Sequence, residues 1–135
     1  MKADPLLLQF ITDLTSRLSV EAVAVFGSRG RGEAWPDSDY DIMVVSDEFA
    51  GQNPIQRWER VAPSWTALKA ADIISVTSAE LLAMDRLILW DALQDGNPLF
   101  DRGVWREAAA RFRRKKEAGE IVPIKGGWRV AEPPA

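Results

Sequence analysis

Two aspartates carry the residue type and spacing best suited to chemistry in this chain. Asp39 and Asp41 stand two residues apart where an apolar strand is expected to begin. Side chains along a strand alternate between its faces, so both carboxylates project to the same side. Like charges this close repel unless a cation lies between them, and Mg²⁺ binds one or two carboxylates together with substrate phosphates. A solvated turn is the alternative interpretation, but it does not account for Asp41 inside an apolar strand.

A glycine-rich turn precedes this pair and suits a phosphate. Gly27 and Ser28 follow an apolar segment, and glycine allows both unusual backbone angles and the close approach of an anion. The Ser28 hydroxyl and nearby amides are donors, and Arg29 and Arg31 add positive charge. Glycine-rich turns after strands are common, so the turn alone is weak support. Its spacing from the two aspartates makes a nucleotide-phosphate site the favoured interpretation.

Two further residues of this loop have open roles. Trp35 could stack on a nucleobase, or it could pack on an adjacent helix as a lid. Asp37 precedes the aspartate pair and is expected to be a turn or capping residue rather than a ligand.

The elements that must position these residues follow from periodicity and capping signals. The pattern predicts helices and strands in the order α-β-loop-β-α-β-α-α, which is typical of a small α+β domain of α/β type. Trp58 and Trp65 are expected in the core, on the apolar side of a helix that Pro63 should kink or break. The expected segments are a helix from Pro5 to Leu18, strands at 20–26, 40–45 and 71–76, a helix from Pro54, and capping-box residues Thr77 and Glu80.

Leu81–Leu93 is nearly apolar on all sides and contains Trp90. A helix of this kind is either central to the fold or covered by a partner, so a homo-oligomer through this segment is one prediction. A last helix ends in basic residues before Gly119, and the Gly- and Pro-containing end, 119–135, is expected to be a tail. We therefore divide the chain into a domain at 1–105 and a basic helix and tail at 106–135.

Composition excludes several classes of function. With no histidine and no cysteine among 135 residues, catalysis by a Ser–His or Cys–His pair and cysteine metal sites are impossible. Residues 1–105 carry 16 Asp and Glu against 9 Lys and Arg, and 106–135 carry 4 against 8. This acidic body disfavours nucleic acid as a general partner; the basic end is either a solvated helix terminus or a contact for RNA or an acidic partner. No membrane span and no signal peptide are expected, so the default location is the cytoplasm.

The quoted motifs resemble the signature of the DNA polymerase β-like nucleotidyltransferases. Gly27–Gly32 followed by Ser38–Val45 is most similar to the minimal nucleotidyltransferases of prokaryotes, with Gly30 where alanine is common and Ile42 where leucine is common. Ala71–Val76 resembles the later strand that brings a third carboxylate. Ala92–Asp101 resembles the end of the minimal domain, where a helix leads to a short apolar strand.

The resemblance implies a small mixed sheet flanked by helices and a role for each matching residue. Asp39 and Asp41 would hold two Mg²⁺ ions, and Asp72 would share one ion and deprotonate or orient the attacking hydroxyl. Gly27 and Ser28 would hold the β- and γ-phosphates of ATP, and Arg31 could add charge there. Taken alone, Asp72 could also simply mark the edge of its strand.

The acceptor is left open by the sequence. Similar stand-alone domains act as antitoxins that adenylylate a toxin of the HEPN ribonuclease type, which makes transfer of AMP to such a protein partner the favoured function by analogy. A non-catalytic module that neutralises a partner is the alternative. Transfer to RNA or a small molecule is a third possibility, although such enzymes usually carry an added acceptor domain.

Overall fold

The computed structural model describes residues 4–35 and 38–130. Its elements, in chain order, are α1 (Pro5–Arg17), β1 (Ala22–Phe26), α2 (Gly27–Gly30), β2 (Tyr40–Val45), η1 (Asp47–Phe49), α3 (Pro54–Val61), η2 (Ala62–Ser64), β3 (Ala71–Val76), α4 (Ser78–Ala83), α5 (Leu87–Asp95), β4 (Asn97–Asp101), α6 (Val104–Glu117), β5 (Ile121–Ile124) and β6 (Gly127–Val130).

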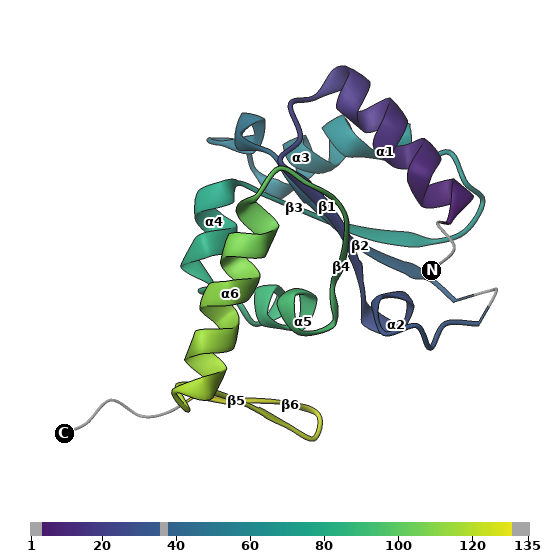
Figure 1. The fold of residues 1–135 in the computed structure, drawn as a ribbon. Helices are drawn as coiled ribbons and strands as arrows, with labels where there is room; N and C mark the ends of the chain where they lie inside the picture. Colours follow the sequence, from purple (N-terminus) through teal and green to yellow (C-terminus); the bar gives the residue numbers. More distant parts are fainter. Residues whose placement is uncertain (1–3, 36–37, 131–135) are drawn as a thin grey trace.

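A mixed four-stranded sheet in the order β3-β2-β1-β4 forms the centre of the fold. β1 pairs antiparallel with β2 and with β4, whereas β2 and β3 are parallel. Helices α1 and α3 cover one face of this sheet, and α4, α5 and α6 cover the other (Figure 1). The expected α+β fold with a mixed sheet is confirmed. The element order predicted from periodicity lacked β4, which the family resemblance had implied as a short strand.

Local signals place the starts of α1, α3 and α4 where the sequence predicts them. The Asp4 carboxylate caps α1 by accepting from the Leu6 amide at 2.9 Å, with proline at the first helical position. Capping boxes begin α3 at Asn53 and α4 at Thr77. These caps fix where each helix begins.

Trp58 was expected in the core, and this prediction is wrong because its side chain is 57% exposed. The helix that carries it ends at Val61, and Pro63 turns the chain into the short η2. The helical spacing that joined Trp58 to Trp65 therefore does not continue. Trp65 does pack on the core, edge-on to Tyr40 with ring centroids 5.0 Å apart.

The apolar segment Leu81–Leu93 is not one helix. Met84 adopts a left-handed conformation with φ of 50°, which ends α4, and α5 begins at Leu87. Trp90 is buried inside the chain, and its Nε1–H donates to the Met84 carbonyl at 2.8 Å. The apolar character that suggested an oligomer is thus explained by burial within the chain, and a homo-oligomer stays a prediction.

The chain after α6 was expected to be a tail, and for residues 121–130 this is wrong. β5 and β6 form a hairpin there. Trp128 packs edge-on to Trp90 and Phe112, with ring centroids 5.9 and 5.6 Å away. Helix α6 itself contributes Trp105, Ala108 and Phe112 to the core. Within the described residues, no helix is long and apolar enough to cross a membrane.

Candidate active site

Gly27 brings the loop and the aspartates together. It follows β1 directly, and the β1–β2 register sets Phe26 opposite Asp41. Gly27 has φ of +63°, and a Cβ at this position would lie 2.3 Å from Asp41 Oδ2. Only glycine allows both this backbone angle and this approach. The Asp41 carboxylate therefore lies directly against the turn that the sequence predicts to bind phosphates, beside Ser28.

Gly30 fixes the other end of this turn. A Cβ there would lie 2.4 Å from the Asp95 carbonyl oxygen and 2.8 Å from that of Val25. The short α2 is consequently packed against the end of α5 without room for a side chain. This contact explains why the chain carries glycine where the resembled family often has alanine.

The structure brings the candidate carboxylates to one end of the parallel strand pair. Asp41 of β2 stands opposite Asp72 of β3 in the register. Both side chains project to the sheet face covered by α4 and α5, as Met43 and Ile74 on the same strands do. Asp39 precedes β2 by one residue and is exposed.

The charges of this group interact. Burial, followed by the negative charges of Asp72 and Asp39, raises the pKa of the Asp41 carboxyl, and Arg31 offsets part of this shift. Such mutual repulsion is the state that a bound cation relieves. Asp72 and Asp39 therefore each lie within electrostatic range of Asp41.

The donor set is chemically suited to Mg²⁺, because carboxylate oxygens are its preferred protein ligands. In residues 4–35 and 38–130, no three acidic side chains are grouped tightly enough to hold one ion alone. Mg²⁺ does not need such a cage, since it is commonly bound by one or two carboxylates plus phosphates and water. The facing pair Asp41 and Asp72, next to a phosphate-type turn, fits this mode of binding.

Arg31 and Trp35 lie at the rim. The Arg31 guanidinium contacts Asp95 at 2.8 Å and Glu33 at 3.1 Å, so its charge is already shared by two carboxylates. The Trp35 side chain is 75% exposed and does not pack on a helix as a lid. An exposed indole at this position leaves base stacking as the role to test. Asp37 lies outside the described residues.

Sequence reasoning missed a group that positions Asp39. The Arg29 guanidinium lies 3.8 Å from the centroid of the Tyr40 ring and donates to the Ser38 carbonyl through Nε at 3.2 Å and Nη2 at 2.6 Å. The Tyr40 hydroxyl in turn donates to Asp4 Oδ2 at 2.6 Å. Burial, together with this hydrogen bond, raises the pKa of Tyr40 to about 12, so the hydroxyl stays a donor.

This group holds the backbone immediately before Asp39 in place. The only signal in the sequence was an arginine within the loop, because a contact from Arg29 to Ser38 has no periodic pattern.

Comparison with known proteins decides the family. Residues 9–103 match the family model described as polymerase beta, nucleotidyltransferase. The chain belongs to this nucleotidyltransferase family. As a family member it is expected to move nucleotidyl groups, and the convergence of the glycine turn with paired carboxylates agrees with that activity.

Solved structures agree with this fold. A protein from Sulfolobus solfataricus described as a nucleotidyltransferase aligns with a TM-score of 0.56 and 23% identity, covering 72% of this chain and 78% of its own. A toxin–antitoxin structure with AMP-PNP aligns with a TM-score of 0.58 and 20% identity, covering 82% and 87%. A mutant of the toxin–antitoxin pair MntA–HpeT aligns at 0.57 and 18%, covering 89% and 90%. No curated protein is significantly similar in sequence.

Proposed function

We propose that this nucleotidyltransferase transfers AMP from ATP to a hydroxyl of an acceptor. The observation that carries the proposal is the meeting of Asp41 with both Asp72 and Gly27. The register sets Asp41 opposite Asp72 and so pairs two carboxylates. A Cβ at Gly27 would lie 2.3 Å from Asp41 Oδ2, so this pair lies against the turn. This arrangement suits a reaction in which a triphosphate must be held beside acidic side chains.

Each candidate residue has a role in this reaction. Asp39 and Asp41 would hold two Mg²⁺ ions, with Asp72 sharing one of them. When bound, the ions offset negative charge on the attacking and departing oxygens. The Ser28 hydroxyl and the amides around Gly27 would bind the β- and γ-phosphates. Arg31 stands close enough to Asp41 to act on its charge and would add positive charge near the phosphates.

The chemical step is an in-line displacement. The acceptor hydroxyl oxygen forms a bond to the α-phosphorus, and the bond between that phosphorus and the α–β bridging oxygen breaks, with its electron pair leaving on pyrophosphate. The hydroxyl proton passes to the Asp72 carboxylate. Neither histidine nor cysteine is required, which agrees with a chain that contains none.

The acceptor we favour is a protein, specifically a HEPN-type toxin that the chain would inactivate as an antitoxin. Support comes from the toxin–antitoxin structures that share its fold, one of which holds the ATP analogue AMP-PNP. The alignments cover 87% and 90% of those chains.

Label transfer from ATP tests the proposal. The chain is incubated with Mg²⁺, α-labelled ATP and the protein encoded beside it, and label on that protein and pyrophosphate release are measured. Asp39→Asn and Asp72→Asn should abolish both signals. Asp85→Asn is the matched control, since this exposed aspartate lies outside the site and should leave both unchanged. Label transfer that persists in Asp39→Asn would contradict the role given to Asp39. No label transfer by the wild type, with full protection of cells by Asp39→Asn, would favour a non-catalytic neutralising module.

A further inference from the structure

β3 leaves one of its edges unpaired. The carbonyls of Ala70 and Val76 face β2, because they accept hydrogen bonds from the amides of Tyr40 and Ser46. Backbone groups of alternate residues in a strand point to opposite sides, so the amides and carbonyls of residues 71, 73 and 75 face away from β2. Of these outward groups in the described structure, the Ser75 carbonyl is bonded, accepting from Arg57 Nη1 at 3.0 Å.

Asp72 lies between the two open positions. Ala71 and Ile73 each present one free donor and one free acceptor on this edge, and neither has a hydrogen-bond partner there within residues 4–35 and 38–130. A strand added to this edge would therefore run beside Asp72, whose carboxylate is the proton acceptor in the proposed reaction.

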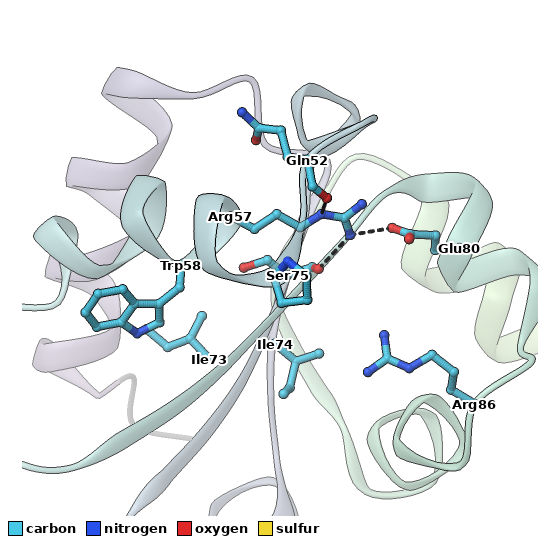
Figure 2. Close-up of a pocket in the computed structure, with 9 residues that line it drawn as sticks. Gln52, Arg57, Trp58, Ile73, Ile74, Ser75, Glu80 and Arg86 are labelled. Carbon is cyan, nitrogen blue, oxygen red and sulfur yellow. Dashed lines mark hydrogen bonds and ion pairs between the residues drawn. The ribbon is translucent and has the colours of Figure 1, made fainter.

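A cavity of about 300 Å³ follows the same edge. Ile73 and Ile74 project to opposite faces of the sheet, yet both line it, so it straddles the strand rather than lying on one face. Figure 2 shows Trp58 of α3 beside Ile73 on one side, and Arg86 near Ile74 on the other. The groove therefore has an apolar wall and a cationic wall.

Two polar groups of this groove lack partners among the described residues. The Ser75 hydroxyl oxygen is buried and makes no hydrogen bond. Arg86 makes no ion pair with another described residue, whereas the nearby Arg57 is paired with Glu80 at 2.7 Å. Buried polar atoms are normally satisfied, so an unpartnered hydroxyl in a groove points to a ligand that supplies the missing bond.

We propose that the acceptor of this transferase is an extended polypeptide segment that binds as an added strand on the outer edge of β3, with a Ser, Thr or Tyr hydroxyl beside Asp72. The inference rests on the proposed function and adds the conformation in which a protein acceptor binds and the edge of the sheet that binds it. An edge that offers donor–acceptor pairs at every second residue matches a polypeptide main chain. Neither an RNA backbone nor a small hydroxyl compound repeats that pattern.

The geometry also places the side chains of the bound segment. Side chains directly opposite each other on adjacent strands lie about 5 Å apart, so a hydroxyl residue opposite Asp72 is within reach of its carboxylate. Its neighbour in sequence would point to the other face, against Ile73 and exposed Trp58, and is expected to be apolar. Arg86 favours an acidic side chain further along the hydroxyl face, and the Arg57 contact with Ser75 ends the pairing there.

Substitutions on β3 separate the edge from the rest of the site. Ile73→Pro removes an outward amide and leaves the β2–β3 hydrogen bonds intact, and proline is tolerated on edge strands. Ile73→Ala is the matched control, because it shortens the side chain and keeps the amide. Acceptor probes are an immobilised library of short peptides, each with one Ser, Thr or Tyr, together with an RNA and a small polyhydroxyl compound, all offered Mg²⁺ and α-labelled ATP.

The wild-type chain should label peptides. Ile73→Pro should lower labelling of the best peptide about tenfold, as expected for a lost main-chain hydrogen bond and a disturbed register. Ile73→Ala loses side-chain contact but keeps the amide, so it should lower labelling clearly less than Ile73→Pro does. Equal labelling by both variants, or label on RNA or the polyhydroxyl compound with none on peptides, would overturn the inference.

Amide hydrogen exchange on the wild-type chain does not depend on how the variants fold. The amides of Ala71 and Ile73 should exchange rapidly in the free chain and slowly with the best peptide, while those of Asp72 and Ile74 are slow in both. No change at residues 71 and 73 would overturn the proposal. Protection of these amides that rises with protein concentration alone would also overturn it, because a second copy would then occupy the edge.

Failure of this inference differs from failure of the proposed function. Pyrophosphate release that Asp39→Asn abolishes, without any labelled peptide, overturns the edge-strand site and leaves nucleotidyl transfer standing. Absence of pyrophosphate release and of label on every acceptor overturns both.

Discussion

The Gly27 backbone and the Asp41 carboxylate are so close that a Cβ on residue 27 would lie 2.3 Å from Asp41 Oδ2. Gly27→Ala should therefore displace this carboxylate and lower transfer at least about 100-fold, as misplacement of about 1 Å at a catalytic group does. Gly51→Ala is the control, because Gly51 has φ of +77° but a Cβ added there would meet no other atom within 4 Å. Both variants should lose about 1 kcal/mol of stability from the left-handed backbone, and only Gly27→Ala should lose activity. Equal activity of the two would contradict the contact.

Asp41→Asn should stabilise the metal-free fold while abolishing transfer. The pKa of Asp41 is raised by burial and then by Asp72 and Asp39, so the folded chain binds a proton more tightly than the unfolded chain does. Wild-type stability should fall as pH rises through the range between the ordinary pKa and the raised one. The gain in Tm of Asp41→Asn should therefore be present at neutral pH and vanish at low pH, and Mg²⁺ with ATP should stabilise the wild type alone. A lower Tm for the variant at neutral pH would contradict the repulsion.

Arg29 is expected to act by positioning Asp39. The planar Arg29 guanidinium donates two hydrogen bonds to the Ser38 carbonyl and stacks on the Tyr40 ring, so a lysine at this position should not replace it. Transfer should fall about 10- to 100-fold in Arg29→Lys, a cost typical of losing precise placement. Arg113→Lys, an exposed change on α6, should be neutral. The kinetic readout is kcat, and an unchanged kcat in Arg29→Lys would rule out the positioning role.

Tyr40→Phe tests the hydrogen bond between the Tyr40 hydroxyl and Asp4, which supports the ring on which Arg29 stacks. It removes the 2.6 Å hydrogen bond to Asp4 and keeps the ring under Arg29. We expect a loss of about 1 kcal/mol in the free energy of unfolding, with transfer largely retained. Chemical denaturation measures the first and label transfer the second. A collapse of activity would show that the hydroxyl itself takes part.

The C-terminal hairpin should contribute to the stability of the whole chain. Trp128 packs against Trp90 and Phe112, and its Nε1–H donates to Asp91 at 2.8 Å. Trp128→Ala should cost about 2 kcal/mol, less than a fully buried tryptophan because the side chain is half-buried. Trp128→Phe, which keeps a ring and loses the N–H donor, should cost about 1 kcal/mol. A Trp128→Ala variant as stable as the wild type would mean that the hairpin does not hold to the core.

The sequence predicted those parts of the site that local rules govern. Alternation along β2 placed Asp41 on one face, and the Gly27 turn was evident from composition and spacing. What local rules could not predict was pairing across distance: that Asp72 faces Asp41, or that Arg29 reaches Ser38. The role of Asp72 beside Asp41 was predicted only through the family resemblance. The contact from Arg29 to Ser38 was found only in the structure.

The errors in the fold have similar causes. Trp58 carries a helical pattern that Pro63 interrupts, so a periodic signal was extended past the end of its helix. Leu81–Leu93 resembled a single helix because a pattern of apolar residues does not reveal the left-handed backbone conformation of Met84. The hairpin at 121–130 has short strands and a Gly-containing turn, and its stability comes from Trp128 packing on α5 and α6.

We infer that Asp39, Asp41 and Asp72 hold Mg²⁺ next to phosphates bound at Gly27 and Ser28. The most direct measurement is a crystal structure of the chain with Mg²⁺ and an ATP analogue in which a methylene group replaces the α–β bridging oxygen. We expect metal density between Asp41 and Asp72, and the β- and γ-phosphates on the turn at Gly27 and Ser28. A nucleotide bound elsewhere, or ions that avoid Asp41 and Asp72, would contradict it.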